Sequence, residues 1–541
     1  MKLVSATYHH PPALEALLCM LSILLLLFAY TYHLGYLPLN TDTDEARRAL
    51  VTAEMMISGD YLTPTINGQL YLNKPPLYNW ILSGWFQLFG NYSMFAFRIQ
   101  VITAVALFSG TIYYFTRKYT SPFIAFFTAM AFATNGRILI YDSLQGLIDT
   151  TFAWLIYAGF MLVYFFGERK KYTLLFITTY LIAAAGFMMK GLPSLVFQGI
   201  TLLTYFIWKK QFRYLFKPAH FGAIFLFLMI IGTYYYFYFS RNNLPPETLF
   251  ANLFEESAKR TGLEFGLGAV LLHILTFPFE TLYHYAPWMI LVVLFFNRRM
   301  RTSIKQQPFL QYNLLIFFFN FIVYWTSPQV YARYLFMFLP LLFVVFFSLY
   351  QSSKKEDSGH IKFLHSLFTI VCFILLIASL ALPFTSSTKF VHDVALRTVI
   401  LSISFALLCF IALKYRQLKL HSFLLAVIVF RLGFNWFVIE QRGARDFYAL
   451  DTAKKIAAVS KDKPLYILKD AKVGNFDGMS FHLATMRNEI LTYDSIINSE
   501  KFFIIDTTQI IPEKTNIIFG FSHPKYDSLL FVQFHDTILK R

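Results

Sequence analysis

The sequence predicts an all-α polytopic membrane protein with a small α/β domain at its C-terminal end. Hydrophobic residues make up 57% of the 541 residues and charged residues only 14%, whereas about a quarter of an average soluble domain is charged. Many apolar runs reach the roughly 20 residues that a helix needs to cross a bilayer, and a chain in lipid must be helical to satisfy its own backbone hydrogen bonds. From Glu440 onward the apolar runs shorten and charged residues become frequent, which indicates a separate soluble domain.

The apolar runs predict about thirteen membrane-spanning helices, with boundaries good to about four residues. The first run lacks the small-residue cleavage site of a secretory signal peptide, so we expect it to be retained as a helix. The predicted spans are 14–34, 96–115, 122–140, 150–166, 173–189, 192–208, 219–239, 281–296, 312–326, 331–350, 363–382, 394–413 and 419–438.

Basic residues are concentrated on one side of this arrangement. The loops after the even-numbered spans hold clusters of Lys and Arg, whereas the short loops on the other side carry single cations such as Arg137 and Lys389. Because cytoplasmic loops are enriched in Lys and Arg, the pattern predicts a cytoplasmic N-terminus and an extracytoplasmic C-terminal domain. The clusters lie within 117–118, 169–171, 209–217, 298–305, 354–362 and 414–419.

This distribution accounts for most of the net charge of +17. The charge therefore reflects membrane orientation and does not indicate a nucleic-acid surface. The three cysteines, Cys19, Cys372 and Cys409, each lie within an apolar run, which argues against a disulfide framework or a zinc site. We expect them to be small buried hydrophobic residues.

The sequence divides into a membrane domain, residues 1–440, and a C-terminal domain, residues 441–541. In the latter, short apolar segments such as LYIL, FFIID and SLLFVQF alternate with polar stretches, as in a small domain that contains a sheet. The segment is long enough for one modest core. It has no glycine-rich phosphate loop and no dinucleotide-binding fingerprint, so the sequence assigns it no chemistry.

The stretch between the first two spans, residues 35–95, is too polar to cross the membrane and too long for a turn. It contains TDTDEARRAL and carries acids and bases that include Asp44, Glu45 and Lys74. The periodicity and acidic start of residues 45–56 predict a helix, and two prolines stiffen the chain after Lys74. One interpretation is a solvated amphipathic cover on the membrane surface. The other is a functional external loop.

Four ionisable residues interrupt the apolar runs at the face predicted to be extracytoplasmic, namely Asp142, Asp149, Lys190 and Arg333. Charged groups at membrane depth are costly and usually indicate a pathway or a site. Taken singly, Lys190 can be explained as a cation that reaches the interface from a helix end, and Arg333 as an interfacial anchor. Together with the charged loop, they predict a mixed site of acids and bases suited to a phosphate-bearing amphiphile.

The loop and several later motifs resemble a known family. TDTDEARRALVTAEMMISGDYLTPTINGQLYLNKPPLYNW is similar to the first external loop of GT-C glycosyltransferases of the protein O-mannosyltransferase and lipid A aminoarabinose transferase (ArnT-like) group, with its Asp-Glu pair, its "sGDw..P..nG" turn and its "KPPL.yW" segment. LIDTTF, GFMMKGLPSLVF, YAPW and SPQVYARYLFMFLPLL resemble further motifs of this group, and FANLFEESAKRTG does so loosely. The resemblance runs through residues 20–350. One departure is Asn73, where members of the group often carry an acid.

The resemblance implies an integral-membrane glycosyltransferase of the plasma (inner) membrane. It would move a sugar from a polyprenyl-phosphate donor to a lipid, glycan or protein acceptor on the extracytoplasmic face, as in lipid A modification or protein O-glycosylation. An inverting single displacement is expected. In such a reaction, cations stabilise the leaving phosphate and a carboxylate acts on the opposite side of the sugar.

On this basis, the residues expected to bind the donor phosphate are Lys74, Lys190 and Arg333. The residues expected in the catalytic group are Asp44, Glu45 and Asp149. Asp44 would be the general base or would position the acceptor, and Asp149 would orient the sugar or the acceptor. Glu45 would support Asp44 or cap the helix.

Two rival interpretations and the identity of the acceptor stay open at this point. A transporter or flippase of lipid-linked sugars would show discontinuous helices and inverted repeats, and the sequence has no internal repeat. A non-catalytic assembly protein would leave the charged loop as mere surface.

A hydroxyl acceptor would need Asp44 to remove its proton, whereas a lipid phosphate is already anionic. A divalent ion would fit beside paired acids, but no spacing of histidines or acids specifies one.

Overall fold

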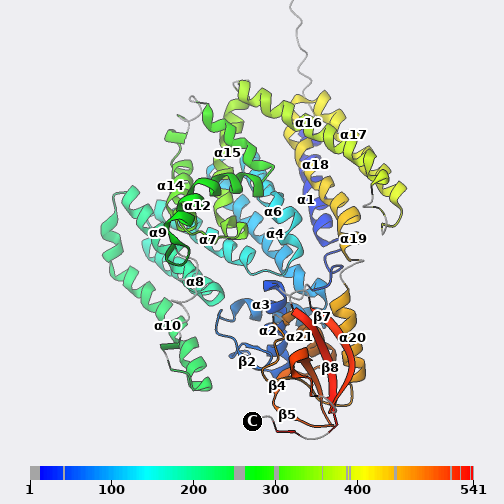
Figure 1. Ribbon diagram of the computed structural model, residues 1–541. Helices are drawn as coiled ribbons and strands as arrows, with labels where there is room; N and C mark the ends of the chain where they lie inside the picture. Colours follow the sequence, from blue (N-terminus) through cyan, green and yellow to red (C-terminus); the bar gives the residue numbers. More distant parts are fainter. Residues whose placement is uncertain are drawn as a thin grey trace, which may run out of the picture. The chain divides into compact units, whose positions relative to one another are not determined.

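The computed structural model (Figure 1) shows two compact units. Unit 1 comprises Met1–Leu34, Val101–Gly232 and Leu253–Arg442, and unit 2 comprises Gly35–Gln100, Thr233–Asn252 and Gly443–Arg541. The structure describes residues 12–539 except 40–42, 246, 249–261, 298–301, 303, 356–357, 386–387, 389–390, 444–446, 475, 512–513, 524–525 and 536–537. The FANLFEESAKRTG stretch, apart from its last glycine, and part of the basic cluster at 298–305 therefore lie outside the described residues.

Helices make up the described part of unit 1. Eleven helices in the described residues are long and apolar enough to cross a membrane, or twelve if the bent pair Pro122–Ala133 and Gly136–Leu144 is one span. Counting the shorter apolar helix α9 (Pro193–Trp208) as well gives the predicted number. The protein is thus an integral membrane protein. The other long helices are α1 (Pro12–Thr31), α4 (Met94–Tyr119), α7 (Asp149–Glu168), α8 (Tyr172–Lys190), α10 (Pro218–Asn242), α12 (Gly262–His284), α14 (Pro308–Trp325), α15 (Leu339–Lys355), α16 (Gly359–Ala381), α17 (Val394–Lys414) and α18 (Lys419–Phe434).

The predicted span at 281–296 is wrong. Helix α12 ends at His284 and is followed by a separate 3₁₀ stretch, η3 (Trp288–Phe296), while the segment with the length and hydropathy of a span is Phe265–His284. Pro287 lacks a backbone N–H and so removes a helical hydrogen bond between the two elements. The polar residues His273 and Glu280 together with Pro278 interrupt the apolar run of α12 in the sequence, so its hydropathy signal is less continuous than that of the other spans.

The bent pair consists of α5 (Pro122–Ala133) and the segment Gly136–Leu144, which comprises α6 (Gly136–Ile140) and the 3₁₀ turn η1 (Asp142–Leu144), with a bend of 46° between the two parts. The Asn135 side chain accepts a hydrogen bond from the Ile138 N–H at 3.2 Å and so caps the second helix. The N–H of Gly136 donates to the Ala286 carbonyl at 2.6 Å. A Cβ atom at position 136 would lie 2.9 Å from that oxygen, so only glycine allows this close approach.

Unit 2 contains a mixed sheet and several helices. The strands β3 (Leu465–Leu468), β4 (Thr492–Asp494), β6 (Phe502–Asp506), β7 (Thr515–His523) and β8 (Tyr526–Phe534) lie in the order β4-β3-β6-β8-β7, and β3 is parallel to both of its neighbours. One face packs Ile467, Ile504 and Phe531 against α20 (Tyr448–Val459) and α21 (Asp477–Arg487). This confirms the small α/β fold predicted for the C-terminal segment.

The rest of unit 2 comes from the loop between the first two spans. It forms α2 (Asp44–Ser58), the hairpin strands β1 (Thr65–Ile66) and β2 (Gln69–Leu70), and α3 (Leu77–Phe89). Helix α2 packs beside α21 of the C-terminal segment, where Arg47 Nε lies 3.1 Å from Asp477 Oδ2. The Phe86 and Phe481 rings also stack, with centroids 6.5 Å apart. Because the loop and the tail pack into one unit, they lie on the same side of the membrane.

Candidate active site

Helix α2 begins with an N-cap and is held in place by a buried ion pair. Thr43 Oγ1 accepts a hydrogen bond from the Ala46 N–H at 3.3 Å. The Glu45 carboxylate accepts two hydrogen bonds from Arg98 of α4, at 2.8 and 3.2 Å, and Arg98 also donates to the Leu37 carbonyl at 2.6 Å. Both side chains are buried. A bidentate pair of this kind fixes orientation as well as position, so Glu45 anchors the start of α2.

Asp44 is the first residue of α2, and 48% of its side chain is exposed. Arg47 Nη1 lies 3.9 Å from its carboxylate, one turn along the helix. A carboxylate at this position is favoured by the positive end of the helix dipole. The structure therefore presents Asp44 at the surface of unit 2 while Glu45 is engaged in the interior.

Glu54, at the other end of α2, holds the hairpin that leads to the KPP segment. Its carboxylate accepts hydrogen bonds from Thr65 Oγ1 at 2.6 Å and from the N–H groups of Asn67 and Gly68 at 2.6 and 3.3 Å. Both turn residues have positive φ, 51° and 74°, as a two-residue Asn-Gly hairpin turn requires. Burial raises the pKa of Glu54, while the three hydrogen bonds oppose that rise.

A cleft opens beside this hairpin, and Lys74 contributes to its wall. The empty space of the cleft is about 360 Å³, part of which is open to solvent. Aromatic residues from the loop and from the end of α10 dominate its lining, which consists of Pro64, Tyr71, Leu72, Lys74, Pro75, Tyr234, Tyr235, Tyr238, Phe239 and Thr248. A cation among aromatic and proline side chains suits an anionic head group attached to a sugar or an isoprenoid chain.

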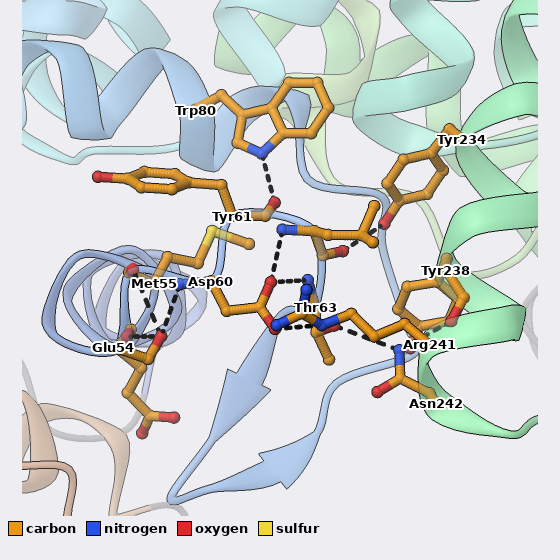
Figure 2. A network of polar contacts seen from close by, with 12 residues as sticks. Glu54, Met55, Asp60, Tyr61, Thr63, Trp80, Tyr234, Tyr238, Arg241 and Asn242 are labelled. Carbon is orange, nitrogen blue, oxygen red and sulfur yellow. Dashed lines mark hydrogen bonds and ion pairs between the residues drawn. The ribbon is translucent and has the colours of Figure 1, made fainter.

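The aromatic wall is tied to the loop by polar contacts, which Figure 2 shows from close by. Arg241 Nε of α10 lies 3.1 Å from Asp60 Oδ2. The Asn242 side chain donates to Thr63 Oγ1 at 3.2 Å, and the Tyr234 hydroxyl donates to the Leu62 carbonyl at 3.2 Å. These contacts hold the ISGDYLTP turn against the end of α10, so the cleft has walls from two distant parts of the chain.

Three predicted site residues meet in unit 1. Asp149 is the first residue of α7, Lys190 the last residue of α8, and Arg333 lies in the 3₁₀ segment η4 (Ala332–Phe338). Lys190 Nζ forms an ion pair with one carboxylate oxygen of Asp149, and Arg333 Nε lies 3.0 Å from the other. Lys190 Nζ also lies 3.8 Å from the centre of the Tyr334 ring. The side chains of Asp149 and Lys190 are each only 6% exposed, so the three charges form a buried cluster.

A second ion pair lies close to this cluster. Arg137 Nε is 2.6 Å from Asp142 Oδ2, and the Asp142 side chain is 2% exposed. Asp142 is near enough to Asp149 and Arg333 for their charges to interact. The charged residues that interrupt the apolar runs thus form one electrostatic network. Its five charged residues, Arg137, Asp142, Asp149, Lys190 and Arg333, come from four different segments of unit 1.

The sequence-predicted residues therefore fall into two groups, each within its own unit. Unit 1 holds Asp149, Lys190 and Arg333 in direct contact, and unit 2 holds Asp44, Glu45 and Lys74. Sequence reasoning missed the tyrosine wall of α10. The run TYYYFYF could have indicated it, because aromatic residues concentrate at membrane interfaces. Among the residues that the structure describes, no three His, Cys, Asp or Glu side chains are grouped so as to hold a metal ion.

Comparison with known proteins supports this interpretation of the motifs. Residues 73–237 match the family described as dolichyl-phosphate-mannose-protein mannosyltransferase. The undecaprenyl phosphate-alpha-4-amino-4-deoxy-L-arabinose arabinosyl transferase of Pseudomonas aeruginosa is 25% identical over 174 residues, 31% of each chain. The corresponding transferase 1 of Proteus mirabilis is 26% identical over 198 residues, 35% of this chain and 36% of that protein. The matched part of the chain thus spans about a third of the length of these relatives.

The fold is shared over nearly the whole chain. The crystal structure of ArnT from Cupriavidus metallidurans bound to undecaprenyl phosphate superposes with a TM-score of 0.63 and 16% sequence identity, covering 95% of this chain and 97% of that one. The apo structure of the same protein gives the same values. The family match and the curated relatives thus concern about a third of the chain, and over nearly its whole length the chain shares the fold of the ArnT crystal structures.

Proposed function

We propose that the protein is an integral-membrane glycosyltransferase that transfers a sugar from a polyprenyl-phosphate donor to an acceptor outside the cytoplasm. The observation that carries the proposal is the cleft of unit 2, in which Lys74 stands among tyrosines and prolines. The names of the relatives support it, because they describe transferases that use an undecaprenyl-phosphate sugar. The same names do not favour a transporter or flippase.

Lys74 would stabilise the phosphate that leaves the sugar. The two prolines after it restrict the backbone, so the ammonium is held close to one position in the cleft wall. Negative charge grows on the phosphate oxygen as the glycosidic bond breaks, and a fixed cation stabilises that transition state more than the ground state. The tyrosine side chains would pack against the sugar or the first isoprene units.

Asp44 would act on the acceptor as general base or positioning group. Its exposed carboxylate can reach an incoming molecule, and the Glu45–Arg98 pair holds the helix start that carries it. Glu45 itself would be a positioning residue, because its carboxylate is occupied by Arg98. A hydroxyl acceptor would attack the anomeric carbon from the side opposite the phosphate, give its proton to Asp44 and displace the polyprenyl phosphate, which inverts the anomeric carbon.

The cluster of Asp149, Lys190 and Arg333 would form a second polar site within the membrane unit. Asp149 holds the two cations side by side, and a lysine and an arginine are the side chains that bind the anionic part of a donor or acceptor. In this role Asp149 orients the cations, and Lys190 and Arg333 contact the ligand. No metal is required for these assignments.

The proposed orientation rests on the distribution of basic loops and on the packing of the loop with the C-terminal segment in unit 2. If the basic loops are cytoplasmic, unit 2 and its cleft lie outside the cytoplasm, at the plasma (inner) membrane, and the N-terminus lies inside. A reporter that is active only outside the cytoplasm should give a signal when fused after Arg541 and none when fused after Leu420. The opposite pair of results would invert the orientation.

The decisive experiment supplies purified protein with a radiolabelled polyprenyl-phosphate sugar pool and membranes. Transfer of label to glycolipid would identify a lipid or glycan acceptor, and transfer to polypeptide a protein acceptor. Translocation of labelled lipid with no covalent product would instead indicate a flippase. Label that stays on the donor on its original side of the membrane would refute both activities.

A further inference from the structure

Arg48, in the first turns of α2, is a buried cation that the proposed mechanism does not use. It is 3% exposed. Its neighbours on the helix are paired, Glu45 with Arg98 and Arg47 with Asp477. Within the described part of the chain, no carboxylate lies within salt-bridge distance of Arg48, and its buried Nη1 group has no hydrogen-bond partner. Burying a guanidinium without a carboxylate partner costs free energy, so a role for this charge would explain why the position is an arginine.

The partner of Arg48 is Tyr71, which lines the cleft together with Lys74. Arg48 Nη2 donates a hydrogen bond to the Tyr71 hydroxyl oxygen. The guanidinium carbon also lies 5.0 Å from the centre of the Tyr71 ring, within the range of a cation–π contact. Because the phenol oxygen accepts from Arg48, the phenol hydrogen is directed away from Arg48 and can be donated to another acceptor.

We propose that Arg48 is a positioning residue of the donor site, which acts through Tyr71 to supply a second, charge-supported hydrogen-bond donor for the phosphate beside Lys74. This inference rests on the proposed function, since it assigns the cleft of unit 2 to a phosphate-bearing lipid. Lys74 contributes a point charge from the cleft wall. Tyr71 contributes a directed O–H group, and the positive charge behind the phenol strengthens that group as a donor.

A purely structural role for the guanidinium accounts less well for these contacts. The backbone of Arg48 is already held, because its carbonyl accepts hydrogen bonds from Thr52 Oγ1 at 2.8 Å and from the Asn79 side chain at 3.1 Å. Helix α2 is also fixed at its start by the Glu45 pair and at its end by Glu54. A neutral side chain of similar length would fill the same space without the cost of a buried charge.

The test compares the binding of undecaprenyl phosphate and of undecaprenol, the same lipid without phosphate, to the full-length protein in detergent. Wild type should prefer the phosphate form. Arg48→Gln should weaken binding of undecaprenyl phosphate by about 10- to 100-fold, the range expected for a charge-supported hydrogen bond, and leave undecaprenol binding within about twofold. Arg48→Lys, which keeps the charge without the planar fork, should recover part of the loss.

A double-mutant cycle with Tyr71→Phe tests whether Arg48 affects phosphate binding through the Tyr71 hydroxyl. In the Tyr71→Phe background, adding Arg48→Gln should change undecaprenyl phosphate binding by less than about twofold, because the connecting hydroxyl is already missing. The control Lys461→Gln removes an exposed cation of the same unit and should have no effect. If Arg48→Gln does not fold, Tyr71→Phe alone must still weaken undecaprenyl phosphate binding relative to undecaprenol binding.

Three results would overturn the inference while leaving the proposed function intact. They are unchanged phosphate binding in Arg48→Gln, equal loss of both lipids, and an undiminished Arg48 effect in the Tyr71→Phe background. A wild-type protein that does not distinguish undecaprenyl phosphate from undecaprenol would instead refute the assignment of the cleft, and with it both proposals.

Discussion

Replacing Lys190 by Met tests whether the buried cluster in unit 1 is one interacting group. Met keeps the aliphatic contacts of the side chain but removes the ammonium from Asp149. Removing one member of a buried ion pair typically costs about 3–5 kcal/mol. Here Arg333 Nε still lies 3.0 Å from the other oxygen of Asp149, so we expect a smaller loss of unfolding free energy, about 1–3 kcal/mol. Asp149→Asn removes the carboxylate charge from both cations, so we expect it to lower the free energy of unfolding by the full amount, about 3–5 kcal/mol.

The measurement is a thermal or SDS-induced unfolding series in detergent on wild type, the two single variants and the double variant. Because the charges interact directly, the double variant should be less destabilised than the sum of the single variants, by about 1–3 kcal/mol. The matched control is Lys209→Met. Lys209 Nζ is 2.7 Å from Glu168 Oε1, but both side chains are about a quarter exposed, and such a pair contributes less than about 1 kcal/mol.

Two outcomes would refute this reasoning. If Lys190→Met is no more destabilising than Lys209→Met, the cluster is not a stabilising buried pair. If the losses from Lys190→Met and Asp149→Asn simply add, the two residues do not depend on each other. In either case the assignment of Asp149 as the residue that holds both cations would have to be abandoned.

The remaining predictions concern unit 2. Asp44→Asn should leave undecaprenyl phosphate binding intact and reduce sugar transfer by roughly two to four orders of magnitude, the contribution expected of a general base; turnover within a few-fold of wild type would exclude it from the mechanism. Lys74→Ala should weaken donor binding and also lower turnover at saturating donor, because the leaving phosphate gains charge in the transition state; unchanged affinity and rate would make the KPP segment a structural brace. Burial lowers the pKa of His482 from 6.5 to about 4, so only the unfolded chain takes up a proton as the pH falls through that window. The stability of α21 should therefore drop by roughly 3 kcal/mol between pH 6.5 and 4. Hydrogen-exchange protection factors of α21 in the full-length protein measure this drop; His482→Gln should abolish it and the exposed His535→Gln should not.

The spans and the charged loop could be predicted because their signals are local. Hydropathy, prolines and acidic helix starts act within one or two turns, and they predicted most of the helices and gave the candidate site residues. The ion pairs could not be predicted from the same signals. Asp149 and Arg333 are far apart in the chain, and only the packing of α7 against η4 brings them together. The same holds for the tyrosines of α10, whose place in the cleft depends on the polar contacts between Asp60 and Arg241.

The charges of TDTDEARRAL have a physical explanation in the surroundings of α2. Most residues of α2 are buried, including the charged residues Glu45, Arg48 and Glu54. Three of the charged positions contact different partners: Glu45 contacts Arg98 of α4, Arg47 contacts Asp477 of α21, and Arg48 contacts Tyr71 beside the cleft. Buried charges are tolerated when they are paired or hydrogen-bonded, and distinct partners on successive faces specify a single orientation of the helix. A displacement of α2 would break these contacts together, so the C-terminal domain, through Asp477, helps to determine where Asp44 and the cleft wall lie.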